Sequence, residues 1–234
     1  MKNKCIASKW AVAFFMMTLV VAFFSWIANI YGWGPIESLF SEEGLRWILN
    51  HTIPNYTHNP VLGNVMVLLM GIGVGVRAGF YNTVSRVFRR FKQISRKERQ
   101  SFLLAVMVGI VYLVVVIGSV PFLKSITGDF VHSPLYNGFF YVVSIGLGLL
   151  GVSYGLASNV YNHLYQIFTG MTCLIARYAD YFVALFFIVL FFTILNYTHV
   201  SDWMKLDKQW VDTIYLICCC LPLIKPYSEL QQRF

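Results

Sequence analysis

The sequence predicts an all-α, polytopic membrane protein with about six membrane-spanning helices and short helices at the interface. Of its 234 residues, 58% are hydrophobic and only 12% are charged, whereas a soluble globular protein carries roughly 25% charged residues. The apolar residues also gather in separate runs of about 20, the length that a helix needs to cross a bilayer. We therefore expect one membrane domain over residues 1–234.

The first predicted span is the apolar run over residues 10–30. A secretory signal peptide has an apolar core of only about 7–15 residues and a small-residue cleavage site, so we expect this longer run to be retained as an anchor. Lys2, Lys4 and Lys9 precede it. Because basic residues concentrate on the cytoplasmic side, the lysines predict a cytoplasmic N-terminus. We expect a multi-pass protein of the inner (plasma) membrane.

A short helix is predicted after the first span, on the outer face of the membrane. Ser41 is a typical N-cap residue, and Glu42 and Glu43 follow in the first turn, where the helix dipole favours anions. Pro54 is expected to end this helix, because proline lacks the N–H that a helix interior requires.

The second predicted span, residues 61–80, carries glycines at every fourth position: Gly71, Gly75 and Gly79. This doubled GxxxG pattern allows another helix to approach closely, so we expect a helix-packing role for all three. Arg77 lies near the cytoplasmic end. Two interpretations of it remain open, because its side chain either extends to the interface or faces a polar cavity.

A basic cytoplasmic loop is predicted over residues 81–100. The chain has a net charge of +8, and eight of its Lys and Arg residues lie between Arg77 and Arg99. One basic loop between two apolar spans is typical of membrane topology and of contact with anionic lipid. It does not have the distribution that a nucleic-acid surface requires, so we expect no nucleic-acid partner.

The third and fourth predicted spans cover residues 101–123 and 135–158. Gly151 and Gly155 give the fourth span a GxxxG pattern of its own. The second and fourth spans are therefore candidates to pack on each other, either within one chain or across a dimer.

The last third of the chain contains a predicted interfacial helix over residues 159–177 and two further spans, at 178–197 and 210–224. Arg177 and Asp180 are three residues apart, so we expect an ion pair that fixes topology. The final run has only 15 residues, about 22 Å of helix, so it either spans a thinned bilayer or is re-entrant.

The residues do not predict an enzyme. The five histidines lie scattered without metal-ligand spacing, and no nucleophile is placed with a base. We expect no catalytic residue, no metal site and no cofactor. The cysteine run Cys218–Cys220 is interpreted as small apolar packing residues.

Three stretches carry a family resemblance. The first is SEEGLRWILNHTIPNYTHNPVLGNVMVLLMGIGVGVRAGF and the second is ISRKERQSFLLA. The third combines SPLYNGFFYVVSIGLGLLGVSYGLAS with YADYFVALFFIVLFFTILNYTHVSDW. In this order they resemble the AbgT family of p-aminobenzoyl-glutamate transporters.

The resemblance implies a longer architecture than this sequence contains. Members of the family have a dimerising scaffold and a transport core with two re-entrant hairpins that hold the substrate and the sodium or proton sites. Here the chain passes from Phe80 through the basic loop to Ser101. We therefore expect a shortened member that lacks the hairpin core, and its substrate-binding residues are unknown.

Two functions follow from these observations. The first is transport related to aminobenzoyl-glutamate permeation, carried out by a homo-oligomer or together with a partner membrane chain in the lipid bilayer. The second is a membrane scaffold or interaction protein that kept the dimerising part and lost transport. A truncated gene product is a third interpretation.

Overall fold

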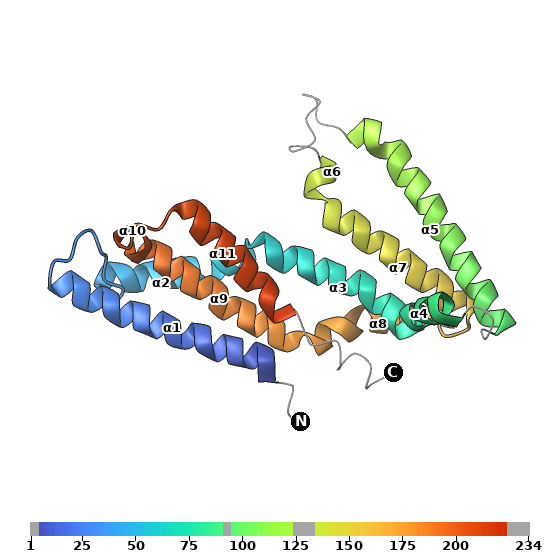
Figure 1. The fold of residues 1–234 in the computed structure, drawn as a ribbon, viewed down its shortest axis with the longest axis horizontal. Helices are drawn as coiled ribbons and strands as arrows, with labels where there is room; N and C mark the ends of the chain where they lie inside the picture. Colours follow the sequence, from blue (N-terminus) through green and yellow to red (C-terminus); the bar gives the residue numbers. More distant parts are fainter. Residues whose placement is uncertain (1–4, 91–94, 124–133, 224–234) are drawn as a thin grey trace. The chain divides into compact units, whose positions relative to one another are not determined.

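The computed structural model describes residues 5–90, 95–123 and 134–223 (Figure 1). Within these ranges all regular structure is helical, as an apolar solvent requires, because a helix pairs its backbone N–H and C=O groups internally. The all-α prediction is confirmed for this part of the chain. In order, the elements are α1 (Cys5–Ile30), α2 (Glu42–Thr57), α3 (Pro60–Ala78), α4 (Phe80–Arg90), α5 (Arg96–Leu123), α6 (Pro134–Asn137), α7 (Phe139–Ala157), α8 (Leu164–Arg177), α9 (Ala179–Tyr197), α10 (Val200–Trp203), α11 (Lys208–Cys220) and the 3₁₀ helix η2 (Leu221–Leu223).

Within the residues that the structure describes, five stretches are long and apolar enough to cross a membrane, which indicates a multi-pass membrane protein. Each of them overlaps one of the first five predicted spans. The sixth prediction, residues 210–224, falls on α11, which has only 13 residues, and on η2; its last residue lies outside the described ranges. That span stays a prediction. The five stretches are Ala7–Ile30, Glu42–Ala78, Arg96–Val120, Phe139–Ala157 and Ala179–Tyr197.

Helix α2 begins where the sequence predicts and ends later. The Ser41 hydroxyl oxygen accepts a hydrogen bond from the backbone N–H of Gly44 at 3.0 Å, which confirms the N-cap. The expectation that Pro54 ends the helix is wrong, because α2 continues to Thr57. The carbonyl of Pro54 still accepts a hydrogen bond from the N–H of His58 at 2.9 Å, so the last turn closes despite the missing proline donor.

The predicted basic loop contains a helix, α4, that the sequence did not indicate. It begins directly after Gly79, whose φ of +79° is a conformation that favours glycine. Phe80 is buried at the start of α4. One turn later the buried Thr83 hydroxyl lies 2.7 Å from the Tyr154 hydroxyl of α7, close enough to share a hydrogen bond. Residues 91–94 of the loop lie outside the described ranges.

The chain divides into two compact units, which are described separately. The first unit comprises Met1–Leu62 and Tyr178–Phe234. Its helices α1 and α9 run side by side (Figure 1). Small residues line their contact, with Ala7, Ala11 and Ala184 forming one buried cluster. Small side chains let the two helices approach closely without voids.

The second unit comprises Gly63–Arg177. Helices α5 and α7 pack together within it, and the Tyr112 hydroxyl of α5 donates a hydrogen bond to the carbonyl of Val142 in α7 at 2.7 Å. Its core gathers residues from several helices and from the connection before α8. The buried members are Val74, Ala78, Phe80, Ala105, Tyr154 and Tyr161.

Polar contacts attach α11 to the rest of the first unit. Asn59, in the turn between α2 and α3, is buried and donates a hydrogen bond from Nδ2 to the Tyr215 hydroxyl at 2.7 Å. The buried Tyr181 of α9 donates its hydroxyl hydrogen to the carbonyl of Cys219 at 3.2 Å. Two hydrogen bonds therefore hold a helix of only 13 residues in place.

Replacing Tyr215 by phenylalanine tests this attachment. The variant Tyr215→Phe keeps the ring that packs on Phe192 but leaves the buried Asn59 amide without its acceptor, at a cost of about 1–3 kcal/mol. We expect faster maleimide labelling of Cys219, which is fully buried, in a variant that retains only this cysteine. Tyr31→Phe, at an exposed tyrosine of the same unit, is the control. Equal labelling rates in both variants would contradict the role of the hydroxyl.

Candidate functional site

The glycines of α3 and α7 bring two backbones into direct contact. A Cβ atom added at Gly151 would lie 2.6 Å from the backbone nitrogen of Gly75 and 2.8 Å from its Cα. A Cβ atom added at Gly71 would overlap the carbonyl oxygen of Ser144. Real Cβ atoms do not approach other atoms this closely, so no larger residue fits at Gly71 or Gly151 without a shift of one helix.

Ser144 adds a hydrogen bond to this contact. It is a buried polar residue within the apolar span Phe139–Ala157. Its hydroxyl donates to the backbone carbonyl of Val67 in α3 at 2.5 Å. A hydroxyl between two helices in lipid is typical of a packing contact. Because the hydroxyl hydrogen of Ser144 is used in this bond, Ser144 does not offer it to a ligand.

The other two predicted packing glycines lie elsewhere. Gly79 has a positive φ, and nothing lies within 4 Å of a Cβ atom built on it, so it forms the turn that ends α3. A Cβ atom on Gly155 would overlap the ring of Tyr161. Gly155 therefore makes room for an aromatic side chain instead of for another helix.

Tyr161 precedes α8, in a segment where the sequence predicted helix and the structure has an irregular connection. Its side chain is 2% exposed, and its hydroxyl donates a hydrogen bond to the carbonyl of Val74 at 2.7 Å. Burial raises the pKa of Tyr161 to about 12, although the charge of Arg77 lowers it. The hydroxyl therefore remains a donor throughout the physiological pH range.

Arg77 lies in the last turn of α3 with an exposed side chain. Its Cδ atom is 3.6 Å from the position of a Cβ atom built on Gly170 of α8. The side chain thus passes Gly170 before it reaches the surface. Both earlier interpretations of its charge remain open.

The predicted pair of Arg177 and Asp180 crosses the boundary between the two units. Arg177 ends α8 in the second unit, and Asp180 lies in the first turn of α9 in the first unit. The ion pair stays a prediction. Asp180 itself lines a groove within the first unit.

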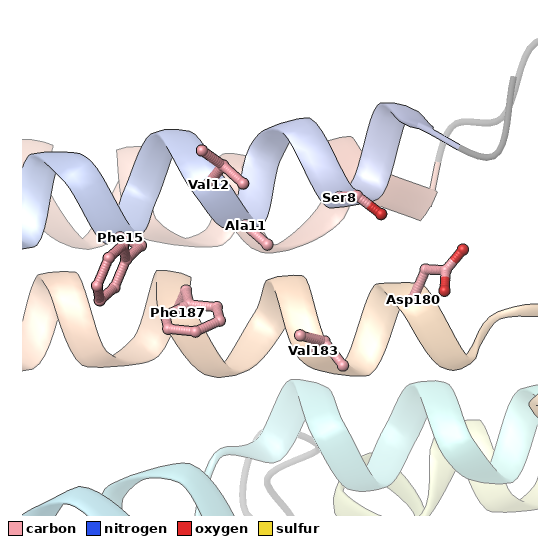
Figure 2. A pocket seen from close by; sticks show the side chains of 7 residues that line it. All are labelled: Ser8, Ala11, Val12, Phe15, Asp180, Val183 and Phe187. Atoms are coloured by element: carbon pink, nitrogen blue, oxygen red, sulfur yellow. The ribbon is translucent and has the colours of Figure 1, made fainter. Parts of the chain in front are cut away.

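This groove is the hollow that the structure places between α1 and α9 (Figure 2). Its volume is about 320 Å³. Ser8 and Asp180 lie together at one end, and apolar side chains of both helices follow from there toward Phe15 and Phe187. The seven lining residues are Ser8, Ala11, Val12, Phe15, Asp180, Val183 and Phe187. The arrangement combines one carboxylate with a mostly apolar channel.

A metal centre is not found in the described ranges 5–90, 95–123 and 134–223, where no group of three or more His, Cys, Asp or Glu side chains is placed to hold an ion. His199 and Asp202 form an exposed pair, with Nδ1 and Oδ2 2.9 Å apart. They lie within one turn at the start of α10. Two adjacent side chains of this kind do not make a ligand set.

Sequence reasoning did not identify Tyr161 or the link between Asn59 and Tyr215 as structural centres. The segment 159–162, which contains Tyr161, has the composition of an ordinary polar connection, so nothing in it marks the tyrosine as a buried residue. Asn59 and Tyr215 are 156 residues apart in the sequence, and a single sequence carries no local signal for such a contact.

Comparison with known proteins relates the chain to membrane transporters. Residues 6–93 match the model of the AbgT putative transporter family. This match covers α1 to α4 and includes the resembling stretch at residues 41–80, so the family resemblance is confirmed for this part of the chain. The other two resembling stretches lie beyond residue 93 and stay predictions. No curated protein and no solved structure matches the chain.

The contact between α3 and α7 can be tested with matched glycine substitutions. We expect Gly151→Ala to destabilise the protein by about 1–3 kcal/mol, as overpacking usually does, because its methyl group meets the backbone of Gly75. Gly118→Ala is the control, since nothing lies within 4 Å of a Cβ atom there. The melting temperatures of both variants are measured by thermal unfolding of the purified protein in detergent. Equal melting temperatures would contradict a direct backbone contact.

Proposed function

We propose that this chain is a membrane transport protein related to the aminobenzoyl-glutamate permeases, working as a homo-oligomer or with a partner membrane chain. The observation that carries this proposal is the match of residues 6–93 to the AbgT putative transporter family. It coincides with α1 to α4, which include the first two candidate spans. Lys9 and the basic residues around α4 support an N-terminus in the cytoplasm and a location in the inner (plasma) membrane.

The need for a second chain is supported by how the polar side chains within the spans are used. Ser144 donates to the carbonyl of Val67, and Tyr181 donates to the carbonyl of Cys219. Each hydroxyl hydrogen is thus committed within its own unit. Aminobenzoyl-glutamate carries carboxylates, which need cationic, N–H or free O–H donors at the binding site. A partner chain or a second copy would supply them.

A non-transporting membrane scaffold is the second candidate function. The observation that favours it is the contact of Gly71 and Gly75 with Ser144 and Gly151, in which both glycine-bearing faces pack within the chain. Such a rigid helix pair suits a structural role as well as it suits the fixed part of a transporter.

Flux measurements separate the two candidates. We expect proteoliposomes containing this chain, alone or with a membrane protein encoded beside it, to take up or release radiolabelled aminobenzoyl-glutamate faster than protein-free liposomes. Unlabelled aminobenzoyl-glutamate should compete, whereas glutamate alone should compete poorly because it lacks the aromatic amide.

Two variants serve as matched controls for this flux. Gly118→Ala should retain it, because the added methyl group meets no neighbouring atom. Gly151→Leu should lose it, because the side chain enters the backbone of α3. Absence of flux in every combination, from protein that remains folded in the membrane, would overturn the transport proposal and leave the scaffold.

A further inference from the structure

The groove between α1 and α9 has the composition of a site for an amphiphile. Its lining residues repeat at helical spacing on both helices, so one face of each helix forms a wall. Val12, Phe15 and Val183 are 56%, 41% and 55% exposed, so the groove is open along its side. Since both helices are long and apolar enough to cross a membrane, this open side faces hydrocarbon chains.

Asp180 makes one end of the groove different from the rest. No hydrogen bond or ion pair of its carboxylate is found within the part of the chain that the structure describes. It does not cap α9 either, because the N-cap position is Tyr178 and no side chain caps it. Ser8 lies at the same end (Figure 2). A carboxylate and a hydroxyl are therefore available together beside an apolar channel.

The charge and the position of this end define the ligand that fits. Asp180 and Ser8 lie in the first turns of α9 and α1, at the ends of two candidate membrane spans, so we expect this end of the groove to lie near the lipid headgroups. A carboxylate binds a cationic N–H donor strongly, and it repels an anionic headgroup. A volume of about 320 Å³ lies at the small end of the range for ligand pockets, so it holds part of an acyl chain.

We propose that this groove binds a phospholipid with an ethanolamine headgroup, whose ammonium group contacts Asp180 and Ser8 while one acyl chain lies along Val12, Phe15, Val183 and Phe187. The proposal does not depend on the transport function. Lipid tails and apolar side chains are equally apolar, so burying the chain adds little selectivity. The headgroup decides which lipid is bound. A choline headgroup has no N–H to donate, and a glycerol headgroup lacks the positive charge.

The test is lipid retention by the purified protein. Detergent-solubilised, delipidated protein is incubated with equal amounts of phosphatidylethanolamine, phosphatidylcholine and phosphatidylglycerol that carry the same acyl chains. Bound lipid is then quantified by mass spectrometry after size exclusion. We expect phosphatidylethanolamine to be enriched about fivefold over the other two, which corresponds to about 1 kcal/mol.

Variants locate the binding to the groove. Asp180→Asn removes the charge of the side chain without changing its size, and it should abolish the enrichment. The control is Asp212→Asn, at an exposed aspartate of α11 in the same unit, which should retain the enrichment. Val12→Trp fills the apolar channel and should lower retention of all three lipids. The headgroup comparison in the wild-type protein stands even if a variant does not fold.

Three results would overturn the proposal. Equal retention of the ethanolamine and choline lipids would mean that the groove has no preference for an N–H donor. Preferential retention of phosphatidylglycerol would assign lipid binding to basic residues instead. Loss of enrichment in Asp212→Asn as well as in Asp180→Asn would mean that the binding lies outside the groove.

Discussion

Direct contact between two backbones is the constraint on which the second unit depends. In lipid, helices gain nothing from hiding apolar surface from water, so van der Waals packing and interhelical hydrogen bonds must hold them together. Gly71 and Gly151 lack the side chains that would keep α3 and α7 apart, and Ser144 bonds across the contact. The ring of Tyr161 then fills the space beside Gly155, and its hydroxyl donates a hydrogen bond to the carbonyl of Val74.

The sequence predicts those features that depend on length and local pattern. Five apolar runs became helices long enough to span a membrane, and Ser41 caps α2. Hydrogen bonds between particular distant side chains, such as the bond of Asn59 to Tyr215, were not predicted. Glycine suits both close packing and a positive φ, so the sequence alone did not separate Gly79, which makes a turn, from Gly71 and Gly75. Pro54 lies within α2 because the turn after it still closes.

The family match indicates what kind of protein this is, whereas the structure shows how its helices are held together. The match to the AbgT putative transporter family spans residues 6–93 and relates the chain to transporters. The contacts explain how its helices stay packed, and they use the hydroxyls of Ser144 and Tyr181 in doing so. The groove beside Asp180 remains open, and its chemistry suits a lipid of the surrounding membrane better than an anionic solute.

Cross-linking tests the close contact of α3 and α7 most directly. In a chain whose native cysteines are replaced by serine, Val67→Cys and Ser144→Cys introduce thiols at the two residues that the hydrogen bond between α3 and α7 joins, and a protease site is inserted between α5 and α7. After oxidation and cleavage, the two fragments should remain one band on a non-reducing gel, while the pair Val67→Cys and Ser153→Cys should separate. A covalent dimer, or fragments that separate in the first pair, would contradict packing within one chain.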